Sequence, residues 1–268
     1  MNKSEFVKVS ENFLKEIIKL PKSDKRRMVS LKTIAVKPNL DDKYDVYKGL
    51  AESFFVSLPK PIQRVFNQAT KLTKDVFIAT DSQDVIDHVK TFTNNVVLTS
   101  NTHISGTDRV YEAARSLEFD DDTFIINLQG DEPFVPVDLL ELILKDYATF
   151  KPDVITASQI ITDKADLNNP NCVKVKSVDG FAEDFQRVFE DDVSELRHHL
   201  GIYGYKLSTL ESLIKLKPTR RELDLKLEQL RFMDNNFSIY VSKYPNRVQG
   251  GIDTQDDVDK AISYLKNL

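Results

Sequence analysis

The sequence predicts an α/β protein with a mostly parallel, doubly wound central sheet. Between residues 31 and 150, short apolar runs alternate with amphipathic stretches, which is the strand–helix rhythm of such sheets. The run "TFIINLQ" (123–129) is mostly apolar, as expected of a strand covered on both faces. Polar residues follow several of these runs directly. With 268 residues, the chain is long enough for one large domain.

In the first half of the chain, the apolar periodicity defines four strands and four helices. The strands are expected at 31–37, 75–81, 95–100 and 123–129. The helices are expected at 61–72, 82–92, 105–117 and 136–150. Ser82 is a suitable cap for the second helix, and Pro136 is tolerated in the first turn of the fourth.

The second half is richer in strands. Strand patterns occupy 153–161, 171–188, 198–207 and 237–245, with a hairpin turn at "VDG" (178–180). Helices are expected at 207–216, 221–235 and 254–268. We therefore divide the chain into an N-terminal helical extension and linker, 1–30, and one domain, 31–268, with a β-rich elaboration at about 153–205.

The N-terminal extension contains an amphipathic helix pattern at 5–20. Its apolar residues recur every three or four positions, at Phe6, Val9, Phe13, Ile17 and Leu20. Such a helix docks on the body of its own chain, or else binds a partner or a membrane surface. The segment "PKSDKRR" (21–27) is a basic, polar linker.

Composition excludes several classes of protein. A net charge of −5 argues against a nucleic-acid surface, although it allows a basic pocket for one phosphorylated ligand. The chain has no apolar run near the ~20 residues that a membrane-spanning helix needs. One cysteine, Cys172, rules out an internal disulfide and fits a reducing compartment. We expect a cytoplasmic protein with no membrane or nucleic-acid partner.

Three polar strand exits follow one another along the chain, at Asp81, at 99–107 and at 129–133. Open parallel sheets bind ligands beyond the carboxyl ends of their strands, so these exits predict one site. Asp131 and Glu132 could form a glycosidase pair, but neighbours in a turn point in different directions. Mg²⁺ is the better use of such a carboxylate, with Asp253 as the second ligand. Asp253 could also simply cap the last helix.

The segment "HISGTDR" (103–109) places small residues at a helix start, where backbone N–H groups favour a phosphate or another polar ligand. Small residues are common at helix starts, so this signal is weak alone. The four histidines show no metal-binding spacing, and no nucleophile turn supports a Ser-His-Asp triad.

Six segments together resemble one family. They are "NLQGDEPFVP", "HISGTDR", "NPNCVKV", "HLGIYGY", "LEQLRF" and "GGIDTQDDV". Their order and spacing are similar to those of the CMP-Kdo synthetases (3-deoxy-manno-octulosonate cytidylyltransferases). The resemblance covers about residues 58–268. It implies a Rossmann-like nucleotide-diphospho-sugar transferase fold, a β-rich part for sugar binding and dimerisation, and a homodimer.

The resemblance also implies an activity: transfer of CMP from CTP to the anomeric hydroxyl of Kdo, or of a related 2-keto-3-deoxy sugar acid, with release of pyrophosphate. In bacteria this reaction serves lipopolysaccharide or capsule synthesis. Asp131 and Asp253 would hold Mg²⁺ and act in catalysis. The sugar pocket would use Gln129, Arg187, His199, Tyr203, Glu228 and Gln229. The cytidine side would use Ser105, Gly106, Thr107 and Arg109. From the residues alone, Tyr203 could be core, Glu228 a surface ion pair and Arg187 a hairpin flank.

The chain departs from the family in the loop that holds the triphosphate. The family pattern is near "IPARxxSxRLPGKPL", whereas this chain reads "TIAVKPNLDDKYDVYKGL". Asn39 and Leu40 replace its first arginine, and the second falls in the acidic stretch "DDKYD". Only Lys37, Lys43 and Lys48 remain as cations, and we expect Lys37 to bind the nucleotide and Lys48 to act in catalysis. Lysine supplies charge without the two-pronged geometry of arginine. The alternative is a non-catalytic paralogue that binds a sugar acid or CMP-sugar in a regulatory or scaffold role.

Overall fold

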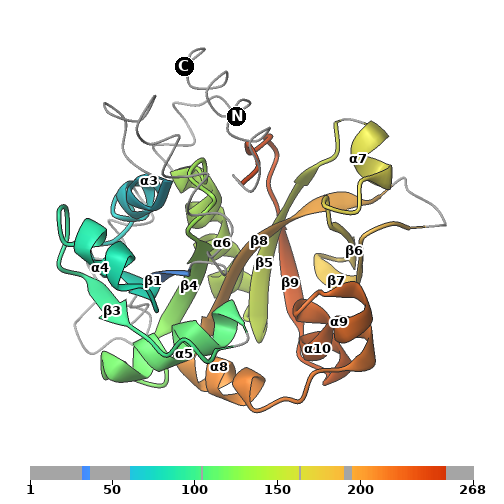
Figure 1. Ribbon diagram of the computed structural model, residues 1–268. Coiled ribbons are helices and arrows are strands. Elements are labelled where there is room, and N and C mark those ends of the chain that lie inside the picture. Colours follow the sequence, from blue (N-terminus) through green and yellow to red (C-terminus); the bar gives the residue numbers. More distant parts are fainter. Residues whose placement is uncertain (1–31, 37–60, 104, 163, 190–194, 252–268) are drawn as a thin grey trace.

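A computed structural model describes residues 32–36, 61–103, 105–162, 164–189 and 195–251 (Figure 1). Several predicted features lie outside these residues: the helices at 5–20 and 254–268, and the residues Lys37, Lys48 and Asp253. The described helices include none long and apolar enough to cross a membrane.

Nine strands occupy the described residues. They are β1 (Lys32–Val36), β2 (Val76–Thr80), β3 (Val96–Leu98), β4 (Phe124–Gln129), β5 (Val154–Ile160), β6 (Lys174–Val178), β7 (Phe181–Gln186), β8 (Arg197–Lys206) and β9 (Ile239–Lys243). The helices of the same residues are α3 (Pro61–Ala69), α4 (Gln83–Val89), α5 (Gly106–Ser116), α6 (Val137–Phe150), α7 (Lys164–Asn168), α8 (Leu207–Ile214), α9 (Arg220–Leu225) and α10 (Gln229–Asp234).

All nine strands join one sheet in the order β3-β2-β1-β4-β8-β5-β9-β7-β6. The first four of this order are parallel, and they form the predicted Rossmann-like half. The chain runs from β1 outward to β3 and then returns to the other side of β1 to form β4. Ligand sites of open α/β sheets lie at such a reversal, beyond the carboxyl ends of the strands. Here the last residues of the two strands, Val36 and Gln129, are register partners.

The elaboration is continuous with this sheet. Strand β8 runs antiparallel between β4 and β5, while β5 and β9 are parallel to each other. The predicted hairpin around "VDG" is the β6–β7 pair, with Gly180 at a positive φ of 86° in its turn. One row of register partners crosses the centre of the sheet, through Lys32, Ile125, Tyr205, Val154 and Ile239.

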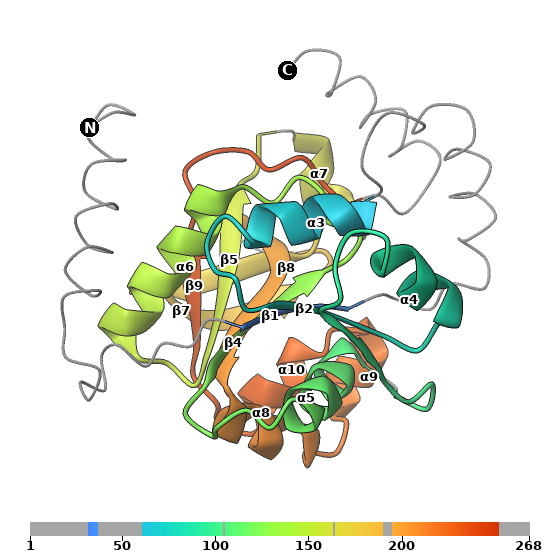
Figure 2. The ribbon, with the colours of Figure 1, turned by 90° about the vertical axis from the view of Figure 1, so that its left-hand side faces the viewer.

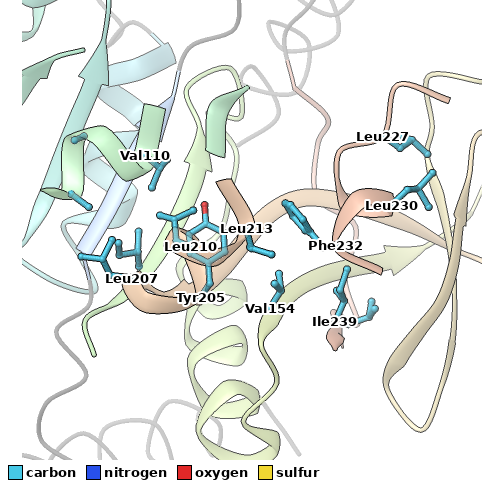
Figure 3. Close-up of a cluster of buried hydrophobic side chains, with 14 of the residues drawn as sticks. Val110, Val154, Tyr205, Leu207, Leu210, Leu213, Leu227, Leu230, Phe232 and Ile239 are labelled. Atoms are coloured by element: carbon cyan, nitrogen blue, oxygen red, sulfur yellow. The ribbon is translucent and has the colours of Figure 1, made fainter. Parts of the chain in front are cut away.

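Helices cover both faces of the sheet, as the apolar strands predict. Figure 2 shows α3 and α6 on one face and α5, α8, α9 and α10 on the other. The alternation of β4 separates two cores: Ile126 and Leu128 face α3 and α6, whereas Ile125 faces α5 and α8. Figure 3 shows the second core, in which Tyr205 packs among leucines of α8.

The elements of the first half confirm the predicted positions to within a few residues. One prediction in the second half is wrong: 221–235 is not a single helix. It divides into α9 and α10, because Lys226 adopts a left-handed φ of 53°. The short helix α7 lies in a segment for which we predicted no element.

Candidate functional site

Gln129 ends β4 at the topological reversal, and Asp131 follows in the next turn. Because side chains alternate along a strand, Gln129 points to the same face as Asn127 and Ile125. Two glycines lie close to this exit. A Cβ on Gly201 would lie 4.0 Å from the Gln129 side chain, and one on Gly251 would lie 3.0 Å from Glu132 Oε1 and 3.2 Å from the Asp131 carbonyl oxygen. The described chain therefore comes back to the Asp131 turn just before Asp253.

His199 and Tyr203 lie on one face of β8, beside this exit. The ring centroids of the two residues are 5.6 Å apart. The His199 Nε2 atom is 2.9 Å from the Thr156 hydroxyl, and its ring meets Phe185 edge-on. Burial, followed by the nearby His198, lowers the pKa of His199 to about 3. The imidazole is therefore neutral at pH 7, suited to hydrogen bonding with an uncharged hydroxyl.

Glu228 and Gln229, at the start of α10, lie on the same face of the sheet as His199 and Tyr203. The Tyr203 hydroxyl donates to Gln229 Oε1 over 3.1 Å. Gln229 is 3% exposed, yet its Nε2 atom has no hydrogen-bond partner among the described residues. A buried donor without an acceptor costs roughly 1–3 kcal/mol. This amide is thus an unmet donor beside the strand exit, of the kind that a polar ligand satisfies.

The start of α5 meets the start of α10. Ser105 caps α5, since its hydroxyl oxygen accepts a hydrogen bond from the Asp108 N–H. The Thr107 hydroxyl donates to Glu228 Oε2 over 2.8 Å, and Arg231 contacts Glu228 Oε1 at 3.1 Å. Burial raises the pKa of Glu228, against the lowering effect of Ser105, Thr107 and the Arg231 charge. Hydrogen bonds thus join the predicted cytidine-side residue Thr107 to the predicted sugar-side residue Glu228.

A group of buried polar side chains that we did not predict lies beneath these residues. Asn127 Nδ2 donates to the Tyr205 hydroxyl over 3.3 Å. Burial raises the pKa of Tyr205, against the lowering effect of Asn127 and Thr107. Within the described part of the chain, the buried Asn127 Oδ1 atom has no hydrogen-bond partner. The signal was present in the sequence: Asn127 is the one polar residue inside the apolar run "FIINL".

Arg109 binds the protein itself. Its guanidinium donates to the Asp81 carboxylate at 2.7 Å, to the Thr99 hydroxyl at 2.6 Å and to the Ser100 carbonyl at 3.3 Å. These partners belong to the exits of β2 and β3. Arg109 therefore joins two of the three predicted strand exits to α5, and nucleotide contact by Arg109 stays a prediction.

Arg187 also binds backbone. It donates to the carbonyl oxygens of Leu225 (2.7 Å), Lys226 (3.2 Å) and Pro170 (2.8 Å). The first two are carbonyls at the end of α9, which have no partner inside the helix. Arg187 thus holds the chain between α9 and α10, next to Glu228. Contact between Arg187 and a sugar carboxylate stays a prediction.

Only some of the residues that we predicted to hold a metal ion lie in the described part of the chain. Among the described residues, no three His, Cys, Asp or Glu side chains gather to hold a metal ion. Asp131 is the described carboxylate that we predicted as a ligand, and Mg²⁺ needs few protein carboxylates because water and substrate oxygens can complete its shell. The approach of Gly251 to the Asp131 turn fits a second ligand from the segment that follows Gly251.

Comparison with known proteins gives concordant matches. The model of the family described as cytidylyltransferase matches residues 60–241. A 3-deoxy-manno-octulosonate cytidylyltransferase from Francisella tularensis is 36% identical over 217 residues, which cover 74% of this chain and 85% of the relative. Its namesake from Psychromonas ingrahamii is 35% identical over 226 residues, covering 77% and 89%.

Solved structures agree with the sequence matches. The CMP:2-keto-3-deoxy-manno-octonic acid synthetase complexed with CTP matches with a TM-score of 0.77 at 26% identity, covering 88% of this chain and 98% of the other. A 4-diphosphocytidyl-2C-methyl-D-erythritol synthase from Anaerococcus prevotii shares the fold, with a TM-score of 0.55 at 14% identity.

Proposed function

The chain belongs to the cytidylyltransferase family, among the 3-deoxy-manno-octulosonate cytidylyltransferases, and from this premise we propose that it transfers CMP from CTP to the anomeric hydroxyl of Kdo. Pyrophosphate is the second product. The observation that carries the proposal is the linked pair of contacts Thr107–Glu228 and Gln229–Tyr203 at the carboxyl ends of the strands. These contacts join the residues assigned to the nucleotide and to the sugar in one site.

The sugar side binds by hydrogen bonds. Gln229 offers its unpartnered Nε2 donor to a sugar hydroxyl, while its Oε1 atom holds Tyr203. Neutral His199 and Gln129 line the same face. Arg187 contributes by holding the end of α9, which keeps α10 in place. The sugar acid can be Kdo or a related 2-keto-3-deoxy sugar acid.

The nucleotide side is the N-terminus of α5 with the segment after β1. Backbone N–H groups of the first turn, at Ser105, Gly106 and Thr107, favour a polar ligand. Val36, the last described residue of β1, is the register partner of Gln129, and Lys37 is the next residue in the sequence. We assign Lys37 and Lys48 to the triphosphate, where their charges offset the negative charge of the phosphates.

Asp131 and Asp253 would hold Mg²⁺. Bound there, the ion would lower the pKa of the attacking hydroxyl and screen the sugar carboxylate from the phosphates. The protein's own contribution is to orient the hydroxyl toward the α-phosphate, which is the main work of enzymes that transfer phosphoryl groups. We propose in addition that the enzyme is a homodimer and acts in the cytoplasm, in bacterial lipopolysaccharide or capsule synthesis.

Pyrophosphate release from CTP and Kdo tests the proposal. We expect Mg²⁺-dependent release, and a loss of more than about 100-fold in Asp131→Asn, because a metal at the reacting centre is worth several kcal/mol. Asp120→Asn is the matched control, since Asp120 is exposed and precedes β4 at the opposite end of the sheet. Near-normal turnover in Asp131→Asn would remove the metal assignment.

Calorimetry separates the enzyme from the non-catalytic alternative. An enzyme binds both CTP and the sugar acid. Sugar binding without CTP binding, together with no pyrophosphate release, would favour the scaffold role.

A further inference from the structure

A group of apolar side chains lies near the surface where α6, β9 and the β6–β7 hairpin meet. We call Phe150, Val178, Phe181 and Tyr240 the aromatic patch. Phe150 stacks on Tyr240 with centroids 4.2 Å apart, and Phe181 meets Tyr240 edge-on at 5.3 Å. Phe181 is the register partner of both Tyr240 and Val178. Phe150, Val178 and Phe181 are 45%, 48% and 37% exposed. Neighbouring apolar side chains that stay this exposed indicate a docking surface.

We propose that the amphipathic segment 5–20 of the same chain packs its apolar side on the aromatic patch. That side consists of Phe6, Val9, Phe13, Ile17 and Leu20. As a helix, the segment would be about 24 Å long.

The chain enters the described fold at a suitable place. Lys32 and Ile239 belong to one row of register partners, four strand steps apart, or roughly 19 Å. Tyr240 follows Ile239, and it packs with the core on the α6 face. Lys32 comes twelve positions after Leu20, and such a stretch can span up to about 40 Å. The segment 5–20 can therefore reach the patch without strain.

The charges of the linker also favour a route of the chain from β1 to the aromatic patch. The linker 21–27 carries four cationic side chains and one Asp. Asp122 lies two residues before β4 and Asp153 directly precedes β5, at the end of the sheet where β1 begins. Burial raises the pKa of Tyr147 on α6 to about 12, and the negative charges of Asp153 and Asp122 contribute to this rise. Asp122 already pairs with Lys206 at 2.7 Å, and Asp153 accepts from Ser238. A basic linker crossing this acidic rim would add to these contacts.

The size of the patch favours a single helix over a second copy of the chain. Partly exposed side chains of this kind offer on the order of 100 Å² each. Their sum is well below the roughly 800 Å² per partner that a stable dimer interface buries. The area of the patch is better matched by one helical face with five apolar side chains.

The absence of tryptophan from the sequence gives a clean probe. In the full-length Phe13→Trp variant, we expect an emission maximum at shorter wavelength than in the same protein unfolded in urea. Phe150→Lys and Val178→Lys, each added to that variant, should shift the emission to longer wavelength. They should also speed tryptic cleavage within 22–27. Both patch positions are well exposed on different elements, so the two variants check each other for folding.

Leu98→Lys is the matched control. Leu98 is 57% exposed and lies on β3, at the far edge of the sheet from β6. Added to the Phe13→Trp variant, it should leave the tryptophan emission and the cleavage rate unchanged.

Several outcomes would overturn the proposal. Emission like that of the unfolded chain means that the segment does not dock, and emission unaffected by both patch variants means that it docks elsewhere. Light scattering that shows a dimer dissociating only in the patch variants would assign the patch to a second copy. A blue shift that requires anionic lipid vesicles would assign the segment to a membrane surface.

Discussion

Gln229 illustrates how one side chain serves both the fold and the site. Its Oε1 atom accepts from Tyr203, whereas its buried Nε2 atom finds no acceptor in the part of the chain that the structure describes. Folding therefore leaves a desolvated donor, which costs roughly 1–3 kcal/mol. A ligand hydroxyl at this position removes that cost on binding. The selectivity then comes from the amide, since a ligand without an acceptor there leaves the donor unmet.

Gln229→Met tests this account. The variant loses the ligand bond, so we expect KM for the sugar acid to rise roughly tenfold, the equivalent of about 1.4 kcal/mol. KM for CTP should change little. Stability in urea should also change little, because the loss of an unmet donor offsets the lost bond to Tyr203.

Gln159→Met is the matched control for stability. Gln159 is also buried, but its Oε1 accepts from the Val248 N–H at 2.5 Å and its Nε2 lies 3.0 Å from His198 Nδ1. Its removal leaves a backbone donor unmet, so we expect a loss of about 1–3 kcal/mol. Equal losses in the two variants would contradict the account of Gln229.

At the scale of elements, the sequence predicted whether a segment forms a strand or a helix better than it predicted where that element ends. Apolar periodicity located β4, α5 and α6 to within one residue. It also predicted one helix over 221–235, where the chain forms α9 and α10. At the break, Arg187, 38 positions from Leu225, donates to the carbonyls of Leu225 and Lys226. A local pattern carries no information about such a tertiary contact, which places Glu228 and Gln229 at a new helix start.

The capping box of α9 supports the same arrangement. The Thr219 hydroxyl accepts from the Glu222 N–H, and Glu222 Oε2 accepts from the Thr219 N–H. Glu222 also pairs with Arg231 of α10 at 3.0 Å. We expect Thr219→Ala to lower the free energy of unfolding by about 1 kcal/mol in a urea titration.

Thr149→Ala provides the comparison for this change. The exposed Thr149 hydroxyl donates to the Lys145 carbonyl within α6, where the backbone is already paired. Its loss should change the free energy of unfolding by less than about 0.5 kcal/mol. If Thr219→Ala changed the free energy of unfolding no more than Thr149→Ala, the capping box would add nothing to the packing of α9.

At the scale of the whole molecule, the sequence predicted the parallel half but not how β8 joins it to the elaboration. Strands such as β1, β2 and β4 alternate with helices, and that rhythm dictates parallel neighbours. An apolar run such as "HLGIYGY" identifies a strand without naming its neighbours, which depend on pairing across long separations. The strand order explains the site, because β8 carries His199 and Tyr203 to the side of Gln129.

The buried His199 makes the stability of the whole fold depend on pH. It lies 7% exposed between β5 and β7, and burial lowers its pKa to about 3. An unfolded histidine has a pKa near 6.5. Between these two values the unfolded chain binds more protons than the folded one, so stability rises with pH across this window and falls as the solution is acidified.

His199→Gln should therefore flatten the pH dependence of stability. From pH 7 to pH 5, the histidine accounts for a loss of about 2 kcal/mol, and the variant should lose that much less than the parent. Urea titrations at the two pH values measure the difference directly. Contributions from carboxylates and from His198 are common to both proteins and cancel in the comparison. Parallel losses in the two proteins would mean that folded His199 takes up a proton as readily as the unfolded chain does. The neutral imidazole assigned to the sugar side would then be wrong as well.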